Sequence, residues 1–542
     1  MANRSIRKVY GSGPTHISVD NFAERIFEIT SRLADRCNEG KDENDTTRTR
    51  RHLVIRGYRM DHEVEAFFNM LSSGVAGDAA KPRTSWGSPS RWKLNLSVAF
   101  WLLVLLGSKM TRPLHQDDSP ALHDIRSLLL GRKTTGFPRL LSVISGQMSF
   151  DEYRKGGAMV TKDDIQKIMA IIISEADVVL TTPGAIVGEY KKYWSRAKAI
   201  AVDEAGCMHR PDLFHVWGNT LRPCVLAGDV KQLPPTVMSL TDKDADGNFL
   251  NRLANEGRVS ALSFIQASGF PVYRLKTQLR MCRGMFDLAA ELVYKDLGGA
   301  QYGPGCDITN PRFAAGQALE KWLQGAYASP AFKAPEPGTL APVWIDTRGT
   351  FCWTDPITQS RKNSKQCDMA LQLIADFIKA TGVDVSSIVI IAPYKLNVDY
   401  INRRLARNRY PTLAKIAEAA TVDSYQGKEG DIVFLVLGTT QKTGPGFTSD
   451  ANRLNVMITR QRCGLVIFGE LSAIGKVGAK DRKNADKAAV KKTVTMGEDG
   501  ELRFINIRVL RSLAVKLVDS GRVLMLNASK VLGDKEEEKV EE

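Results

Sequence analysis

Residues 200–206 read IAVDEAG: an apolar run, two adjacent carboxylates and two small residues. The apolar run predicts a buried strand, and Asp203 and Glu204 stand where that strand ends. Ligands of open α/β sheets bind at the carboxyl ends of the strands. An Asp there is suited to hold Mg²⁺ through its hydration shell, and a Glu to orient and deprotonate water. For this pair alone, a turn with two solvated acids is the plain alternative.

Further strand predictions lie on both sides of this stretch. Each is a short β-branched run followed by a polar loop, and helical stretches such as 364–382 separate the later ones. The runs are DVVLTT (177–182), CVLAGD (224–229), PVWID (342–346), SIVIIAP (387–393), DIVFLVLG (431–438) and GLVIFG (464–469). Strands that alternate with helices predict two α/β domains with doubly wound parallel sheets.

Three other regions differ in composition. Residues 45–165 are rich in Arg, Gly, Pro and Trp and contain helical patches such as 61–71, so we expect an inserted, mainly helical subdomain. The apolar stretch at 96–107 is shorter than the ~20 residues that a membrane helix needs, which predicts a buried core helix. Residues 473–542 form a basic and then acidic extension, whose end, DKEEEKVEE, is typical of a solvated tail.

The overall composition favours a polyanionic partner. The 542 residues carry a net charge of +15, and clustered Lys and Arg gain from the release of counterions bound to nucleic acid. A basic solvated surface is the alternative. No two of the 8 cysteines are spaced as C-x-x-C, which argues against a zinc ribbon and fits a reducing compartment. The N-terminus has no signal-peptide pattern. The 8 tryptophans are interpreted as core residues, with base-stacking platforms as the alternative.

A second chemical string, AGDVKQLPP, occupies residues 227–235 after a predicted strand. The side-chain amide of Gln232 can donate to a phosphate and accept from a water molecule at the same time. A double proline makes the loop rigid enough to hold such an amide against a terminal phosphate. We therefore expect Gln232 to sense whether that phosphate is present.

Two arginines stand in later strings that start or end the second α/β series. Arg280 lies in RLKTQLRM (274–281), and Arg460 lies in NRLNVMITRQRCGLVIFG (452–469). A planar guanidinium can stabilise the charge on a transferring phosphoryl group, so both are candidate arginine fingers. Between them, TVDSYQGKEGDIVFLV (421–436) predicts a strand, a polar loop and another buried strand.

In this order the strings resemble superfamily 1 helicases of the nonsense-mediated-decay and Dna2/Nam7 type, over about residues 9–470. GPTHISVDNFAERI (13–26) and TTPG (181–184) are similar to the family's motifs Ia and Ic, and VDEAG to its Walker B motif. AGDVKQLPP is similar to motif III, QLRM to motif IV, TVDSYQGKEGD to motif V and NVMITRQR to motif VI. QLRM continues with Cys-Arg where the family usually has HP.

The resemblance implies two RecA-like domains of the P-loop NTPase fold that close on ATP and Mg²⁺, with single-stranded DNA or RNA across both. It places the first domain at 1–44 and 166–250, the accessory subdomain at 45–165 and the second domain at 251–472. The implied catalytic residues are Asp203, Glu204, Gln232, Arg280 and Arg460, of which Asp203 binds the metal. Gly427 and Glu429 join Asp203, Gln232 and Arg460 in nucleotide binding. Thr15, His16, Thr181, Thr182, Pro183, Thr421 and Gln426 line the nucleic-acid path, although helix capping is an alternative for such hydroxyls.

One expected string is absent from the printed sequence. A Walker A loop reads GxxxxGK[ST], and its lysine reaches the β and γ oxygens of the nucleotide. The Gly-Lys pairs at 40–41, 427–428 and 475–476 are not followed by Ser or Thr. The family's P-loop precedes motif Ia, so the resemblance would place it before Met1. We interpret the chain as an incomplete gene model or a degenerate paralogue. Its first domain would then lack the phosphate lysine and the central strand that carries the Walker A loop.

Two functions remain open at this point. One is an ATP-dependent helicase, which explains why both acids, the glutamine and both arginines are present. The other is a non-enzymatic nucleic-acid-binding or scaffold protein derived from a helicase. A different metal-dependent phosphohydrolase would not account for the later motifs. The expected contacts are to the nucleic-acid backbone, so the sequence does not separate DNA from RNA, and it leaves cytoplasm and nucleus both open.

Overall fold

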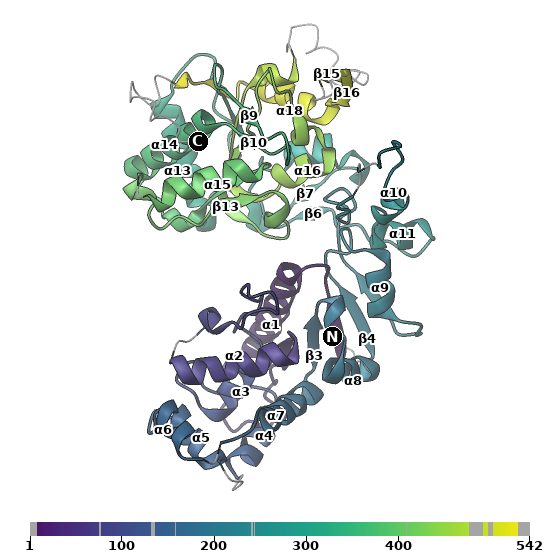
Figure 1. The fold of residues 1–542 in the computed structure, drawn as a ribbon. Coiled ribbons are helices and arrows are strands. Elements are labelled where there is room, and N and C mark those ends of the chain that lie inside the picture. Colours follow the sequence, from purple (N-terminus) through teal and green to yellow (C-terminus); the bar gives the residue numbers. More distant parts are fainter. Residues whose placement is uncertain are drawn as a thin grey trace. The chain divides into compact units, whose positions relative to one another are not determined.

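The computed structural model describes residues 8–74, 77–131, 136–157, 159–239, 242, 244–407, 409–475, 492–496 and 502–528. The chain forms two compact units (Figure 1). Unit 1 comprises Met1–Val230 and Pro234–Phe270, and unit 2 comprises Lys231–Leu233 and Pro271–Glu542. The acidic tail expected at 534–542 and most of the Lys-rich stretch before it lie outside the described residues.

The sheet of unit 1 has five parallel strands in the order β2-β3-β1-β4-β5. They are β1 (Val9–Ser12), β2 (Val54–Arg56), β3 (Val178–Thr181), β4 (Ala199–Val202) and β5 (Cys224–Leu226). Strand β1 lies at the centre and pairs with both β3 and β4. The loops after these three strands therefore meet at one edge of the sheet, and they carry motif Ia, motif Ic and the VDEAG acids.

Helices cover this sheet and connect its strands (Figure 1). They are α1 (His16–Asn38), α2 (Met60–Ser73), α3 (Val98–Leu106), α4 (Pro120–Leu130), α5 (Phe137–Ile144), α6 (Phe150–Lys155), α7 (Lys162–Glu175), α8 (Gly188–Arg196), α9 (Arg210–Trp217), α10 (Ala254–Gly257) and α11 (Ala261–Ala267). Helix α3 is the apolar stretch at 96–107, and eight of its nine residues are buried. No helix among the described residues is long and apolar enough to cross a bilayer.

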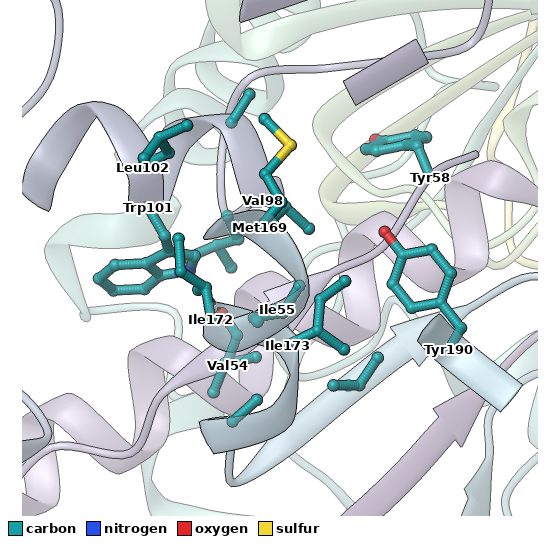
Figure 2. Packing of buried hydrophobic residues seen from close by; sticks show 14 of the residues in the cluster. Val54, Ile55, Tyr58, Val98, Trp101, Leu102, Met169, Ile172, Ile173 and Tyr190 are labelled. Atoms are coloured by element: carbon teal, nitrogen blue, oxygen red, sulfur yellow. Dashed lines mark hydrogen bonds between the residues drawn. The ribbon is translucent and has the colours of Figure 1, made fainter. Parts of the chain in front are cut away.

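Residues 45–165 share the hydrophobic core of unit 1. The sequence led us to expect no strand there, but β2 pairs with β3 at one edge of the sheet. Figure 2 shows Val54 and Ile55 of β2 packed beside Trp101 of α3 and Ile172 and Ile173 of α7. β2 has only three residues, VIR, which are too few to show the alternation of apolar and polar residues by which a strand is predicted.

The main sheet of unit 2 has six parallel strands in the order β12-β11-β13-β14-β8-β17. They are β8 (Val343–Asp346), β11 (Ile388–Ala392), β12 (Ala420–Thr421), β13 (Gly430–Val436), β14 (Gln461–Gly469) and β17 (Val523–Met525). Alternate residues of β13 enter two separate core clusters, Val433 and Leu435 on one face and Ile432, Phe434 and Val436 on the other. Both faces are thus buried, as parallel sheets require.

Helices lie on both faces of this sheet (Figure 1). They are α12 (Asp287–Leu292), α13 (Ala314–Ala326), α14 (Ser364–Thr381), α15 (Lys395–Ala406), α16 (Ala451–Met457) and α18 (Arg508–Asp519). Three two-stranded sheets accompany them: β6 (Thr277–Gln278) with β7 (Gln301–Tyr302), β9 (Trp353–Thr354) with β10 (Arg361–Lys362), and β15 (Lys492–Met496) with β16 (Leu502–Asn506). The two doubly wound parallel sheets confirm the predicted α/β, RecA-like fold class.

The segment after residue 472 also contributes to unit 2. Strand β17 pairs in parallel with β8, and α18 buries Leu510, Leu513 and Leu517 in the core cluster that contains Val433. Arg522, which precedes β17, is 1% exposed. The sequence predicted only an extension here. Strand β17 has three residues, too few for a recognisable strand pattern, and it forms by pairing with β8.

Candidate functional site

The two acids of IAVDEAG lie in a tight turn after β4 in unit 1. The Asp203 N–H donates to the carbonyl of Ser12 on β1 over 2.9 Å, and the Glu204 N–H donates to Oδ1 of Asp203 over 2.9 Å. Glu204 has a φ of 52°, in the left-handed region that non-glycine residues rarely occupy. Such strained conformations persist where the surrounding structure fixes them and are concentrated at functional sites.

Two glycines allow this turn to pack against the loop after β5. A Cβ on Gly206 would lie 2.5 Å from the carbonyl oxygen of Asp229, and one on Gly228 would lie 2.6 Å from the Gly206 nitrogen. The Ala205 N–H donates to the carbonyl of Ala227 over 2.8 Å. The VDEAG and AGDVKQLPP loops are therefore in backbone contact, which explains why glycine rather than alanine follows Ala205.

Asp203 has the properties of a cation ligand. Burial raises the pKa of its carboxyl, and the hydrogen bond from the Glu204 N–H only partly offsets this. A divalent cation would supply the positive charge that stabilises the carboxylate. The described residues hold no cluster of three or more His, Cys, Asp or Glu side chains that could enclose a metal alone. Asp203 thus fits Mg²⁺, which takes one or two carboxylates and completes its shell with phosphate and water oxygens.

Thr15 and His16, expected on the nucleic-acid path, begin helix α1. The Thr15 hydroxyl accepts from the Ser18 N–H in a capping box, so it already has the capping role that was the alternative. The Nδ1 atom of His16 lies 3.0 Å from a guanidinium nitrogen of Arg56, to which it can serve only as acceptor. Burial and the Arg56 charge lower the pKa of His16 to about 4. The imidazole is therefore neutral at physiological pH.

Thr181, Thr182 and Pro183 follow one another at the end of β3. The Thr181 side chain is fully buried and its hydroxyl is hydrogen-bonded to the hydroxyl of Tyr10 and the carbonyl of Thr182. Thr182 precedes the 3₁₀ turn Pro183–Ala185, in which Pro183 is buried. Thr182 is half-buried and Gly184 in the turn is exposed, so both are more accessible than Thr181.

In unit 2 the two candidate arginine fingers meet at one residue. Arg280 donates to the backbone carbonyl of Thr459 over 2.5 Å, and Arg460 donates to the hydroxyl of the same threonine over 3.0 Å. Arg460 is 3% exposed and also donates to the carbonyl of Val456 over 3.1 Å. Two residues that lie in separate motifs are thus brought together by the end of α16.

Gln232 belongs to the same unit as these arginines. A guanidinium nitrogen of Arg460 donates to Oε1 of Gln232 over 3.2 Å. The side chains of Asn452 and Asn455 donate to the carbonyls of Gln232 and Lys231, and Lys231 pairs with Asp296. The tripeptide Lys231–Leu233 is therefore anchored to unit 2 at several points, and Gln232 is held beside an arginine.

Glu429 and Asp431 balance part of the positive charge around this site. Glu429 accepts from Arg462 over 2.9 Å and lies 3.4 Å from Nε of Arg280. Asp431 accepts from Arg462 over 3.1 Å. Arg462 thus pairs with both carboxylates, and Glu429 also lies beside Arg280.

Thr421 ends β12, and Gln426 and Gly427 lie in the loop that leads on to β13. Gly427 has a φ of 75°, a value that glycine adopts without strain. Gln426 ends the 3₁₀ turn Asp423–Tyr425 and is half-buried. The Thr421 hydroxyl accepts from the Ser424 N–H over 3.2 Å and donates to the Ser424 hydroxyl over 2.9 Å. This hydroxyl therefore caps a turn, as Thr15 caps a helix.

Sequence reasoning did not single out the residues that position these groups. Asn452 and Asn455 stand three residues apart on α16, within the string quoted for Arg460, and both contact the Lys231–Leu233 tripeptide. Their helical spacing was a usable signal. Thr459, by contrast, acts through its position between two guanidinium groups, which only the fold reveals.

Two sequence families match this chain. A family described as an AAA domain matches residues 258–472, and a second with the same description matches residues 149–240. The first range contains Arg280, Glu429 and Arg460. The second contains Asp203, Glu204 and Gln232. The matched ranges therefore include both groups of residues described above.

Individual proteins are similar over part of the chain. DNA-binding protein SMUBP-2 of Rattus norvegicus is 30% identical over 244 residues, 44% of this chain and 21% of that protein. Regulator of nonsense transcripts 1 homolog of Neurospora crassa is 28% identical over 370 residues, 66% of this chain and 30% of that protein. DNA replication ATP-dependent helicase/nuclease JHS1 of Arabidopsis thaliana is 25% identical over 286 residues, 51% of this chain and 19% of that protein. The matches thus span 19–30% of the length of these relatives.

Proposed function

We propose that this chain, which belongs to the superfamily 1 helicases of the nonsense-mediated-decay and Dna2/Nam7 type, is an ATP-dependent motor that moves along single-stranded DNA or RNA. The observation that carries this proposal is the meeting of Arg280 and Arg460 at Thr459, with Gln232 bonded to Arg460. A protein that only binds nucleic acid has no need for two arginines and an amide gathered in this way. Charge stabilisation of a phosphoryl group does need them.

In unit 1, we assign the chemistry of water and metal to the turn after β4. Asp203 would hold Mg²⁺, and Glu204 would orient the attacking water and accept its proton. Mg²⁺ bound to ATP supplies charge neutralisation on the phosphates. The strained Glu204 backbone and the buried Asp203 carboxyl both support a turn shaped for function rather than for stability.

In unit 2, we assign the sensing and stabilisation of phosphate charge to Gln232, Arg280 and Arg460. Glu429 would keep Arg280 oriented, because it pairs with both Arg280 and Arg462. Gly427 would let the backbone before β13 approach the nucleotide closely, because glycine has no Cβ and adopts a φ of 75° without strain. These roles come from the motif resemblance, and the hydrogen bonds within unit 2 support them.

The proposed polymer is contacted through its backbone. Thr15, His16, Thr182 and Pro183 of unit 1 lie at the edge where β1 and β3 end, and Thr421 and Gln426 of unit 2 lie at the end of β12. Contacts of hydroxyls and backbone N–H groups to phosphate give affinity without sequence preference. DNA and RNA are therefore both candidates, and we place the protein in the cytoplasm or the nucleus, where such polymers occur.

A non-enzymatic nucleic-acid-binding protein or scaffold is the second candidate. It applies to a polypeptide of the printed 542 residues alone, in which no GxxxxGK[ST] string, and so no Walker A lysine, occurs. Removing one preorganised charge-stabilising group from an active site typically costs about 10²–10³-fold in rate. Binding through the backbone contacts named above would not depend on that lysine.

The two candidates are separated by measuring ATP hydrolysis and binding on the same purified chain. With single-stranded oligonucleotide, the motor predicts stimulated hydrolysis that falls roughly 10²–10³-fold in Glu204→Gln, because the variant cannot accept a proton from water. Glu189→Gln is the matched control, since Glu189 is paired with Lys192 on the surface of α8. Oligonucleotide binding with equal background hydrolysis in all three proteins would contradict the motor and support the second candidate.

A further inference from the structure

One tryptophan of unit 1 is almost fully exposed, contrary to the expectation that all of them lie in the core. Trp86 is 93% exposed, whereas Trp92, six residues later, is 1% exposed. Both belong to residues 81–93, KPRTSWGSPSRWK, which we call the Trp86 loop. Single exposed apolar residues are common on protein surfaces, so Trp86 needs further observations before it indicates a site.

The Trp86 loop holds its tip in a defined turn. The Thr84 N–H donates to the carbonyl of Ser88 over 2.7 Å, and the Gly87 N–H donates back to the carbonyl of Thr84 over 2.9 Å. An antiparallel bridge between Arg83 and Pro89 extends this ladder. Trp86 therefore projects from a hydrogen-bonded turn, which lowers the entropy that the indole would lose on contact with a partner.

The base of the loop is fixed to the core of the unit. The indole N–H of Trp92 donates over 3.0 Å to Glu63, a carboxylate that is itself fully buried on α2. The Leu94 N–H donates to Asp78 over 2.9 Å. The chain that follows the Trp86 turn is thus fixed to unit 1 at two points.

The loop is strongly basic. Lys81, Arg83, Arg91 and Lys93 are exposed, and the segment contains no Asp or Glu. Lys93 lies 3.4 Å from Asp20. Within the described part of the chain, Lys81, Arg83 and Arg91 have no carboxylate within ion-pair distance. Their charges are therefore available to a polyanion.

The loop lies beside the start of helix α1. Lys93 pairs with Asp20, and the Asn95 side chain just beyond the loop donates to Glu24 over 3.1 Å; both acids are on α1. The charge of Arg91 also contributes to the lowered pKa of His16, which places this guanidinium near the first residue of α1. Thr15 and His16 are the residues for which we propose nucleic-acid contact.

We propose that the Trp86 loop is an additional binding site for single-stranded nucleic acid, in which Trp86 stacks on one base. Arg83 and Arg91 neutralise phosphates on either side of that base. Aromatic rings on a basic surface bind single strands in this manner, because every base has a face that can stack. This site rests on the proposed binding of nucleic acid by unit 1 and is independent of ATP hydrolysis.

The test measures the affinity of the full chain for labelled oligothymidine, without nucleotide. Trp86→Ala is expected to weaken binding by roughly ten- to hundredfold, the range for loss of one stacked base. Trp86→Phe should retain most of the affinity. Trp353→Ala is the matched control, because Trp353 is also exposed and has Lys362 near its ring, but lies in unit 2.

Two further arms identify the chemistry. An abasic oligomer should bind wild type and Trp86→Ala equally, because it offers phosphates without bases. Arg83→Ala and Arg91→Ala should each reduce the salt dependence of binding by about one charge. Oligothymidine bound equally by wild type and Trp86→Ala would overturn the inference, and so would polyglutamate bound as tightly as oligothymidine.

The results also separate this inference from the proposed function. Loss of affinity in Trp86→Ala without any ATP hydrolysis would support the loop site and contradict the motor. If oligonucleotide stimulates ATP hydrolysis equally in wild type and Trp86→Ala, and both bind oligothymidine with equal affinity, the result would support the motor and contradict the loop site. Failure of wild type to bind any single strand would overturn both. An unchanged Tm for Trp86→Ala is expected, because the side chain is exposed.

Discussion

Arg460 donates a hydrogen bond to Gln232 over 3.2 Å, although the two residues are 228 positions apart in the chain. Gln232 follows the last strand of the unit 1 sheet, yet its tripeptide is part of unit 2. The side chain proposed to sense a phosphate is thus already bonded to a side chain proposed to stabilise one. A bound phosphate would compete for both groups, which gives this pair two alternative sets of partners.

Replacing Arg460 with lysine should destabilise unit 2 by about 2–3 kcal/mol. The buried guanidinium bonds Val456, Thr459 and Gln232 together, and a lysine ammonium cannot reproduce that fork. Urea denaturation measures the change. Arg403→Lys is the control, because Arg403 is exposed on α15 and donates to the carbonyl of Asp399 in the same helix, and it should change stability by less than about 0.5 kcal/mol. Equal effects of the two variants would contradict the prediction.

Gly206→Ala should destabilise unit 1 by about 2 kcal/mol or more. The new Cβ would lie 2.5 Å from the Asp229 carbonyl oxygen, and both contacting groups are backbone that cannot turn aside. Thermal unfolding of the variant tests this. A Cβ on Gly184 of the same unit meets no atom within 4 Å, so Gly184→Ala should leave Tm nearly unchanged. A normal Tm for Gly206→Ala would show that the two loops can separate at little cost.

Unit 1 should lose stability as pH rises toward 7, because the buried carboxyl group of Glu63 then loses its proton. Burial raises the pKa of its carboxyl from 4.5 to about 7, even though Trp92 and three backbone N–H groups donate to it. The folded chain therefore keeps a proton between pH 4.5 and 7 that the unfolded chain has released. The stability that this proton contributes is complete below pH 4.5 and is lost as pH rises through about 7.

The measurement is the difference in unfolding free energy between wild type and Glu63→Gln across this pH range. That difference should fall by about 3 kcal/mol from pH 4.5 to above pH 7. His16, whose pKa is lowered to about 4, acts in the opposite direction over a similar range. Because both proteins retain His16, its contribution cancels in the difference. A difference that does not vary with pH would contradict the raised pKa.

Arg522→Ala should destabilise unit 2 by about 3–5 kcal/mol. The buried guanidinium donates to both carboxylate oxygens of Glu320 and to the carbonyls of Lys333 and Ala341, and its loss leaves a largely buried carboxylate unpaired. Denaturant unfolding quantifies the loss. Lys395→Ala removes an exposed pair with Asp399 on α15 and should cost less than about 0.5 kcal/mol. A small effect of Arg522→Ala, similar to that of the control, would contradict the prediction.

The sequence by itself determined the two parallel sheets and the strings that contain the candidate site residues. Strands such as β13, at 430–436, are buried on both faces, so their continuous apolar runs are visible without a partner. Ligands of such sheets bind at the ends of these runs, which is why the sequence predicts Asp203, Glu204 and Gln232 as site residues. Helix α14 was likewise predictable, because its apolar residues recur at helical spacing.

Only the tertiary structure decided which of these residues meet and which side chains remain accessible. Strands β2 and β17 have three residues each and exist because a neighbouring strand completes their hydrogen bonds. The contact of Arg280 and Arg460 at Thr459 depends on the ends of distant segments and has no local pattern. Trp86 and Trp92 are the same residue type in one short loop, but only Trp92 has Glu63 as a buried acceptor. Burial depends on the partners that the fold supplies, and residue type alone does not determine it.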